Sequence, residues 1–331
     1  MKSRIWVLAF FLVIVFSATA NAAMKDRLVP ITADNVKMSV DTFIIGTYNR
    51  YIATIVRDLD AEALDDLGEP MRAVAALQDN KNLALLEKIA FDKNAKRLSL
   101  LERNLVLASD LKTRLSVEPT TDTGMQDAAP GTFAEVLWNT VAGPNGLGRK
   151  ILGEDPAPVA ISKDDKNPVD AKRYAVVFKN QIGGLFLDRD SIKATESGCS
   201  AIIVESFDYD GELHFGGMAM QYTYQPYVDA SYAVSTYEYS FVQLAHRLLR
   251  FTKFSADGKV IYSIKNPNLE WITGETDVEL PFALLTLRQN LPEDVAKLMP
   301  NDIKWFDEFM RESIEKASKE QKETHNTETA K

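Results

Sequence analysis

Residues 246–264, HRLLRFTKFSADGKVIYSI, decide the fold of the second half of this chain. Two β-rich runs, His246–Phe254 and Lys259–Ile264, flank a short polar segment that contains Asp257-Gly258. An Asp-Gly pair readily adopts the tight turn that joins two antiparallel strands. The stretch therefore predicts a β-hairpin.

More strands are expected on either side of this hairpin, and short turns between them imply an antiparallel sheet. Asp210-Gly211 is a second turn signal of the same kind. A short helix over Val278–Leu287 and an amphipathic helix over Asn301–Ala317 follow. We expect an antiparallel β-sheet domain over 171–288, a C-terminal helix over 289–317 and a disordered tail over 318–331. The other expected strands are Tyr174–Lys179, Gly184–Asp188, Ser200–Phe207, Met218–Tyr224 and Ser235–Gln243.

The first half of the chain shows helical spacing instead. Apolar residues recur at intervals of three and four in two stretches, which is the period of one helix face. We therefore expect a helical hairpin region over 23–115, and a linker with one short helix over 116–170. The fold class predicted is α+β: an N-terminal helical hairpin followed by an antiparallel β-sheet domain with flanking C-terminal helices. The apolar residues with this spacing are Ile44, Tyr48, Ile52, Ile55 and Leu59, then Leu98, Leu101, Leu105 and Ala108.

The first 22 residues have the pattern of a secretory signal peptide. Lys2 and Arg4 precede an unbroken apolar run of twelve residues, and Ala20-Asn21-Ala22 offers a small-residue cleavage site before Ala23. Twelve residues are fewer than the ~20 needed to span a bilayer, which favours cleavage over an uncleaved anchor. We expect export to the periplasm or cell surface of a Gram-negative-type bacterium, with no transmembrane segment after cleavage.

Composition limits the chemistry available. The 331 residues carry a net charge of −9, which argues against electrostatic binding of nucleic acid over a broad surface. The chain has one cysteine, Cys199, and three histidines. His214 and His246 stand in no metal-ligand spacing, so we expect no metal and no cofactor.

Signals for catalysis are weak. No serine lies in a G-x-S-x-G turn, and Cys199 belongs to no recognisable Cys–His arrangement. We therefore expect a protein that is not an enzyme and has no catalytic residues. An unrecognised hydrolase with His214 or His246 as the base is the alternative.

Tyrosines are concentrated in one stretch of the sheet domain, where six of the chain's eleven lie between residues 222 and 239. One reading is an aromatic ladder that stabilises the sheet. The other is an exposed patch that binds a protein, a sugar or a planar ligand. The candidate binding residues are Tyr222, Tyr224, Tyr227, Tyr237 and Tyr239.

The β-rich part, about residues 174–288, resembles the surface-adhesin protein E-like domain of exported bacterial proteins. The resemblance is carried by Tyr174–Phe178, by the stretch from Gly184 to Ile192 with Asp188 and Ser191, by the central strands with Asp257-Gly258, and by Trp271 before the closing helix. Independently of the family, Ser191 can hydrogen-bond the turn backbone back to Asp188 at the end of a strand. Family members commonly have cysteines where Phe241 and Leu287 stand here. The resemblance implies an adhesin or ligand-binding surface module.

The function predicted is an exported, non-enzymatic binding or interaction module of the cell envelope, with an unknown protein or small ligand as partner. The alternative within the binding class is a periplasmic small-molecule carrier with a Tyr-lined groove.

Overall fold

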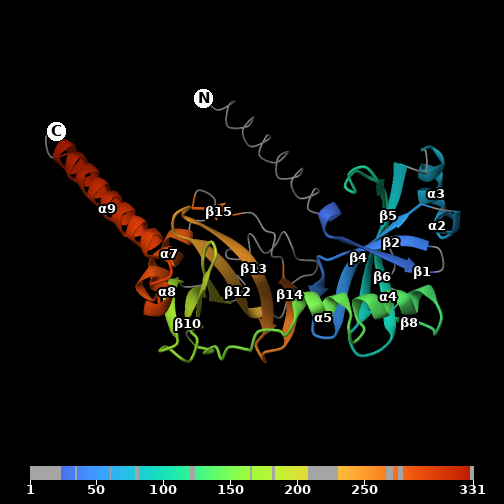
Figure 1. Ribbon diagram of the computed structural model, residues 1–331, viewed down its shortest axis with the longest axis horizontal. Coiled ribbons are helices and arrows are strands. Elements are labelled where there is room, and N and C mark those ends of the chain that lie inside the picture. Colours follow the sequence, from blue (N-terminus) through green and yellow to red (C-terminus); the bar gives the residue numbers. More distant parts are fainter. Residues whose placement is uncertain are drawn as a thin grey trace. The chain divides into compact units, whose positions relative to one another are not determined.

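The computed structural model describes residues 24–328 except 34–35, 60, 79–81, 120–123, 165, 181–182, 208–229, 266–270 and 275–278. The chain divides into two compact units (Figure 1). The first unit comprises residues 1–155 and 262–265, and the second comprises 156–261 and 266–331. Antiparallel β-sheet dominates each of them.

The sheet of the first unit has the strand order β7-β6-β5-β4-β3, with the end of β14 beside β3. The hairpin β1–β2 joins it through pairing of β2 with β4, and β8 pairs with β6. The strands are β1 (Leu28–Ala33), β2 (Val36–Asp41), β3 (Ile45–Gly46), β4 (Arg50–Asp58), β5 (Leu83–Asp92), β6 (Arg97–Leu107), β7 (Arg114–Pro119), β8 (Gln126–Asp127) and β14 (Val260–Lys265).

The predicted α+β class with a helical hairpin over 23–115 is wrong, because antiparallel β-sheet dominates the structure and both stretches with helical spacing form strands. In β6, Leu101 is an extra residue: Lys88 of β5 pairs with Glu102, and the next residue, Ile89, pairs with Leu100. Such a bulge interrupts the two-residue alternation of a strand, so Leu98 and Leu105 share a face at odd spacing. In the earlier stretch, Tyr48 lies between β3 and β4 and is 67% exposed, so it belongs to no buried stripe.

Side chains on the two faces of this sheet form separate cores. On one face, Ile55 and Phe91 pack with Trp138 and Val141 of α4 (Phe133–Val141), next to α5 (Leu147–Leu152). Leu85 and Leu105 of the same face pack against the short helices α2 (Ala61–Asp65) and α3 (Glu69–Ala76). The opposite face carries a smaller cluster of Val56, Ala84, Val106 and Leu111, with Met24 and Leu86 against it.

The second unit is built on an antiparallel meander with the order β9-β10-β11-β12-β13, to which β15 adds at β13. The hairpin predicted around Asp257-Gly258 is confirmed, since β13 and β14 are neighbours joined by this turn. The predicted strand Met218–Tyr224 lies outside the described residues. The strands are β9 (Tyr174–Lys179), β10 (Gly183–Thr195), β11 (Gly198–Phe207), β12 (Ala230–Ser240), β13 (Ala245–Ser255) and β15 (Ile272–Thr273).

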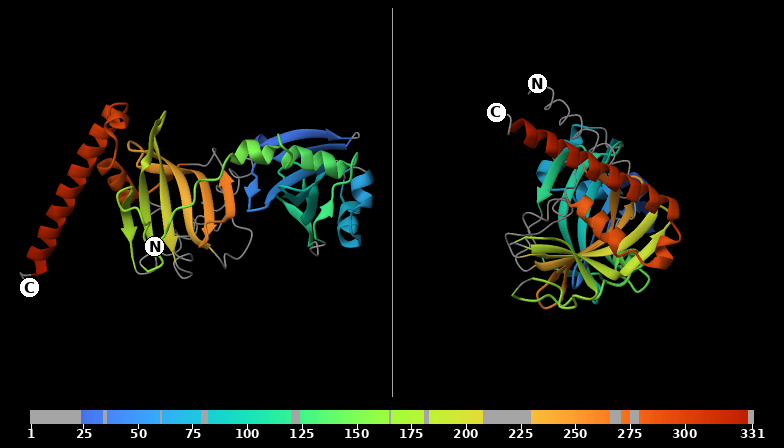
Figure 2. Two further views of the ribbon diagram at one scale, coloured as in Figure 1. Left: turned by 90° about the horizontal axis from the view of Figure 1, so that it is seen from below. Right: turned by 90° about the vertical axis from the view of Figure 1, so that its left-hand side faces the viewer.

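Helices cover one face of this second sheet (Figure 2). Leu284 and Leu287 of α7 (Leu280–Gln289), Val295 of α8 (Glu293–Ala296) and Phe306 of α9 (Pro300–Glu328) pack on Leu187, Ala201 and Tyr239. The other face packs Phe186, Val204, Tyr232 and Phe254 together, and Val159 and Ile161 from the segment before β9 cover it.

Two segments contain more secondary structure than the sequence predicts. The segment 116–170, expected to hold one short helix, contains most of β7, β8 and the two helices α4 and α5. Helix α9 continues to Glu328, so most of the tail expected to be disordered is helical.

Candidate functional site

A pocket of about 290 Å³ opens on the face of the first sheet opposite α4. Its walls come from neighbouring strands and from the chain segment before β1. Alternation along the strands directs every second side chain of β4, β5 and β6 to this face. The lining residues are Met24, Thr54, Leu86, Lys88, Glu102, Asn104, Leu111, Lys112 and Arg114.

Strand register brings these residues together. Thr54 of β4 lies opposite Lys88 of β5, and Lys88 lies opposite Glu102 of β6. One step along, Leu86 of β5 pairs with Asn104 of β6. Directly opposed side chains in antiparallel strands stand roughly 5 Å apart, so the two rows form a continuous floor.

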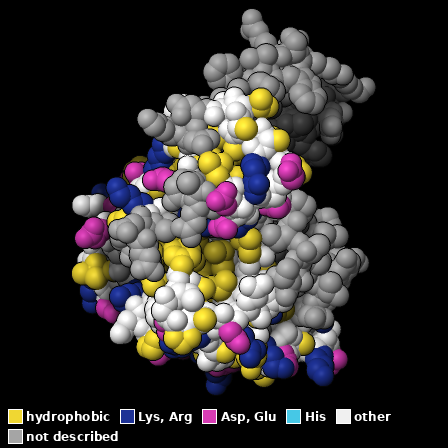
Figure 3. All heavy atoms as spheres, turned by 90° about the vertical axis from the view of Figure 1, so that its right-hand side faces the viewer, with side chains coloured by type: hydrophobic (Ala, Val, Ile, Leu, Met, Phe, Trp, Pro, Cys, Tyr) yellow, Lys and Arg dark blue, Asp and Glu magenta, His cyan; other side chains and the backbone are white. Residues whose placement is uncertain are grey.

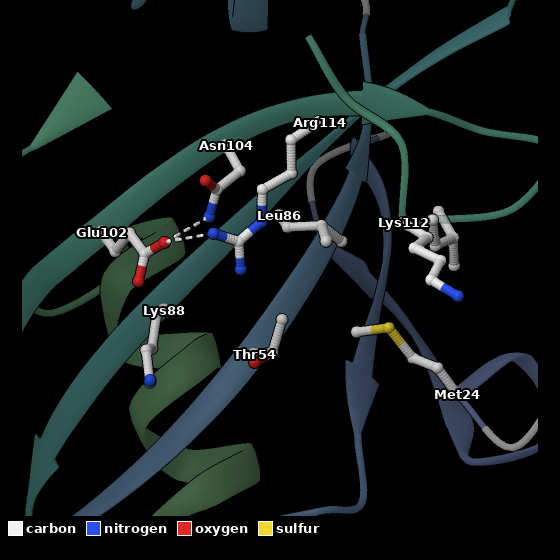
Figure 4. Close-up of a pocket in the computed structure, with 9 residues that line it drawn as sticks. Met24, Thr54, Leu86, Lys88, Glu102, Asn104, Lys112 and Arg114 are labelled. Atoms are coloured by element: carbon white, nitrogen blue, oxygen red, sulfur yellow. Dashed lines mark hydrogen bonds and ion pairs between the residues drawn. The ribbon is translucent and has the colours of Figure 1, made fainter. Parts of the chain in front are cut away.

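Charged side chains lie at both ends of the pocket (Figure 4). Glu102, Lys88 and Asn104 lie at one end, Met24 and Lys112 lie at the other, and Leu86 and Thr54 lie between them. The Asn104 Nδ2 donates to Glu102 Oε1 at 2.8 Å, and Arg114 Nη1 lies 3.7 Å from the same oxygen. Glu102, the single carboxylate of the lining, is therefore in contact with Asn104 and with Arg114, which is one of the three lining cations.

Burial disfavours the charged form of the Lys88 side chain. The pKa of its ammonium is lowered chiefly by desolvation, with a further lowering from Arg114 and an opposing effect of Glu102. A cation that has lost part of its hydration gains more from a bound anion than an exposed one does, because the interaction is less screened.

The turn that carries Leu111 and Lys112 is strained at a bulky residue. Leu111 has a φ of 54°, a left-handed conformation that is unusual for leucine, and its side chain is only 7% exposed. The Asp110 carboxylate holds this turn by accepting from the backbone N of Lys112 and of Thr113 and from the Thr113 hydroxyl, at 2.9, 3.0 and 2.6 Å. Backbone strain of this kind persists where the surroundings fix it, often at functional sites.

One face of the molecule offers a comparison with the charge of the pocket lining. On the face drawn in Figure 3, hydrophobic side chains gather in a hollow, and Lys and Arg are interspersed with Asp and Glu around it. That face is therefore mixed in charge, whereas the pocket lining holds three cations and one carboxylate.

The structure separates the candidate tyrosines. Tyr237 and Tyr239 share a face of β12, with ring centroids 6.0 Å apart. Tyr239 is 1% exposed and belongs to the core under α7 and α9, and Tyr237 packs partly buried against that core. Tyr232, from the same stretch, is 2% exposed and stacks on Phe254. Tyr222, Tyr224 and Tyr227 lie outside the described residues.

His246 and Cys199 share one row of the second sheet, in which Tyr239 of β12 pairs with both. Two strand spacings, roughly 10 Å, therefore separate them. The His246 ring stacks on Tyr237 with centroids 4.7 Å apart and is 4% exposed. Burial raises the pKa of the Cys199 thiol to about 12, helped by Glu238, so the thiol stays protonated at neutral pH. The arrangement does not activate Cys199 as a nucleophile. His214 lies outside the described residues.

Asp188 and Ser191 have structural partners. The Ser191 hydroxyl donates to the Asp188 carbonyl at 2.6 Å, as expected, but both residues lie inside β10, at its irregularity, rather than at a strand end. Arg173 forms two hydrogen bonds to the Asp188 carboxylate, at 2.9 and 2.7 Å. The Arg247 guanidinium lies over the Trp271 ring, with its Cζ 4.9 Å from the ring centroid. These contacts give Asp188, Ser191 and Trp271 a structural role in the fold, which explains the motif without any role in binding.

Neither a metal-binding cluster nor a membrane-spanning helix is found in the described part of the chain. Within it, no group of three or more His, Cys, Asp or Glu side chains could hold a metal ion. Over the same residues, no helix combines the length and apolar character needed to cross a bilayer.

None of the pocket residues was predicted from the sequence. Lys88, Glu102 and Asn104 lie in a stretch whose apolar spacing predicts a helix, on which they would lie on different faces. The available signal was local: Leu86 and Lys88, and Glu102 and Asn104, are spaced by two. That spacing places each pair on one face of a strand but not of a helix.

Comparisons with known proteins add nothing to this geometry. No family model matches the chain, and neither the curated proteins nor the solved structures contain a match.

Proposed function

We propose that this chain is an exported, non-enzymatic binding protein that holds a small amphipathic anion in the pocket of its first unit. The observation that carries the proposal is the composition of the lining, which holds three cationic side chains, Lys88, Lys112 and Arg114, and one carboxylate, Glu102. This concentration of cations occurs in a chain whose net charge is −9. The proposal keeps the carrier alternative but moves its site from the tyrosines to the first sheet.

The size and texture of the pocket support a small ligand with an apolar part. A volume of about 290 Å³ lies at the lower end of the range for small-molecule sites. Met24, Leu86 and Leu111 offer apolar contact beside the cations. A short-chain carboxylate combines both properties, with its carboxylate toward Lys88 and Arg114 and its chain along Leu86.

The test is hexanoate binding to the wild-type chain and to the Lys88→Met variant, followed by calorimetry and by thermal unfolding. A hydrogen bond to a charged group contributes about 1.5–3 kcal/mol, so we expect hexanoate affinity to fall by at least about tenfold in the variant. Methionine keeps most of the length of the side chain and removes a partly desolvated charge. The Tm without ligand should therefore not fall.

The matched control is Lys150→Met, which removes an exposed lysine on α5, a helix packed on the other face of the sheet. It should bind hexanoate as the wild type does. Acetate tests the apolar contact and should bind more weakly than hexanoate. Equal hexanoate affinity in the wild type and in Lys88→Met, or no binding by either, would exclude the proposed site.

A further inference from the structure

We propose that Lys88 holds the ligand through a reversible imine, so that the ligands of this pocket are small oxo acids, carboxylates that also carry a ketone or an aldehyde. The inference rests on the proposed function and deepens it, because it names the ligand class of the same site. It starts from the cluster of Lys88, Arg114 and Glu102 in the pocket lining.

The pocket places an amine and a guanidinium on either side of one residue. Lys88 of β5 stands opposite Glu102 of β6, at the roughly 5 Å side-chain spacing of paired strand residues. The Arg114 Nη1 lies 3.7 Å from Glu102 Oε1 (Figure 4). A ligand carboxylate at Arg114 therefore brings the atoms bonded to it within reach of the Lys88 amine.

The surroundings of Lys88 favour its neutral amine, which is the form that reacts with a carbonyl group. Desolvation by burial is the main cause that lowers its pKa, and the charge of Arg114 lowers it further, against the opposing effect of Glu102. Lysines that form imines in proteins are activated by these same two means, burial and a neighbouring cation.

Imine formation at Lys88 needs no oxidant, reductant or cofactor. The ammonium first releases a proton to water. The neutral Nζ then forms a bond to the carbonyl carbon of the oxo acid, and the carbonyl oxygen leaves as water with the two remaining amine protons. Hydrolysis reverses the step and releases the ligand unchanged, so the imine serves binding and not turnover.

The rest of the lining limits the form of the oxo acid. In a 2-oxo acid the ketone carbon is bonded directly to the carboxylate carbon, so a carboxylate at Arg114 presents the ketone to Lys88. The alkyl chain then lies along Leu86, between the two ends of the pocket. A volume of about 290 Å³ admits only a small acid.

The test is reductive trapping of the full chain with 2-oxohexanoate, which differs from hexanoate by a ketone alone. Cyanoborohydride reduces an imine to a stable amine, and digestion followed by mass spectrometry locates the adduct. Lys150, an exposed lysine on α5, is the internal reference. We expect Lys88 to be labelled at least about tenfold faster than Lys150, because a bound ligand holds its carbonyl beside the amine. An excess of hexanoate should slow the labelling of Lys88 and leave that of Lys150 unchanged.

The reagent 2-hexanone tests the ligand class, since it keeps the ketone and lacks the carboxylate. The ratio of labelling at Lys88 to labelling at Lys150 corrects for the intrinsic reactivity of each reagent. This ratio should be several-fold lower with 2-hexanone than with 2-oxohexanoate. Equal ratios would overturn the assignment to oxo acids.

Binding of hexanoate separates the two proposals, because hexanoate has no ketone or aldehyde. Labelling of Lys88 no faster than that of Lys150, in a chain that binds hexanoate, would overturn the imine and leave the proposed function standing. Absence of hexanoate binding would overturn the proposed function itself. Lys88→Arg keeps a positive charge but has no amine, so its intact mass should show no fast-forming adduct. A fast-forming adduct that persists in Lys88→Arg would lie on another lysine and overturn the assignment to Lys88.

Discussion

Asp188 shows how one buried carboxylate organises a strand irregularity. Its side chain is 2% exposed, while its partner Arg173 remains 45% exposed. Asp188→Ala should lower the free energy of unfolding of the second unit by about 2 kcal/mol, because hydrogen bonds to charged groups contribute about 1.5–3 kcal/mol. Urea unfolding followed by circular dichroism measures this change. Asp190→Ala is the control: that carboxylate is 75% exposed and 3.9 Å from Arg173, and its loss should change stability by less than about 0.5 kcal/mol. Equal effects would mean that Arg173 is not selective for Asp188.

Asp110 links the pocket turn to pH. Hydrogen bonds from the Thr113 hydroxyl, then from the backbone of Thr113 and Lys112, lower the pKa of its carboxyl to about 2. A depressed pKa in the folded state stabilises the fold above the unfolded value of about 4, and this contribution is lost as the pH falls toward 2. Thr113→Val removes the largest cause and should raise the pKa of Asp110. Carboxyl-carbon NMR titration measures that pKa directly.

The same variant makes a prediction about stability. Thr113→Val should be less stable than the wild type at pH 6, and the difference should shrink as the pH falls from 4 to 2. A difference that stays constant over this range would show that the Thr113 hydroxyl stabilises the turn without acting through the charge of Asp110.

At the scale of elements, the β10–β11 turn depends on a close backbone approach. Gly198 has a φ of 148°, and a Cβ on it would lie 2.1 Å from the carbonyl oxygen of Tyr239 in β12. Gly198→Ala should therefore destabilise the second unit by about 3 kcal/mol or more, through displacement of β11 from β12. Gly131→Ala is the matched control, since Gly131 also has a positive φ, of 74°, but nothing lies within 4 Å of its Cβ position. It should cost only about 1 kcal/mol. Thermal unfolding of both variants separates the cost of a positive φ, which both share, from the cost of steric overlap, which only Gly198→Ala incurs.

Prediction from the sequence succeeded where local turn chemistry determines structure. Tyr174–Lys179 was predicted with the bounds of β9, and Asp257-Gly258 gave the hairpin, because these signals lie within a few residues of one another. It failed in the first unit, where the extra residue Leu101 converts the alternation of β6 into helix-like spacing. The pocket could not be predicted either, because its residues come together through strand pairing. Lys88 and Glu102 meet only through the register of β5 with β6, which no local pattern in either stretch specifies.

At the scale of the whole molecule, the two units have separate cores, and the segment 156–169 belongs to the second one. Val159 and Ile161 pack on the face of Tyr232 and Phe254, and the backbone N of Val159 donates to the Tyr232 hydroxyl at 3.1 Å. A stretch expected to be a linker therefore acts as a cover for the sheet.

Val159→Asn tests this cover in the full chain. Val159 is half-buried against an apolar cluster, so the change removes apolar contact and partly desolvates a polar amide. We expect it to destabilise the second unit by about 2 kcal/mol. Hydrogen exchange measured by mass spectrometry should then be about thirtyfold faster in β12 and β13, and unchanged in β4 and β5. Val169→Asn changes a 67% exposed valine of the same segment and should leave exchange unaffected in all four strands. Faster exchange in β4 and β5 as well as in β12 and β13 would show that the two units unfold together. No change in any strand would show that Val159 does not stabilise the sheet. Because each core is built from its own unit's strands, we expect the effect of Val159→Asn to stay in the second unit.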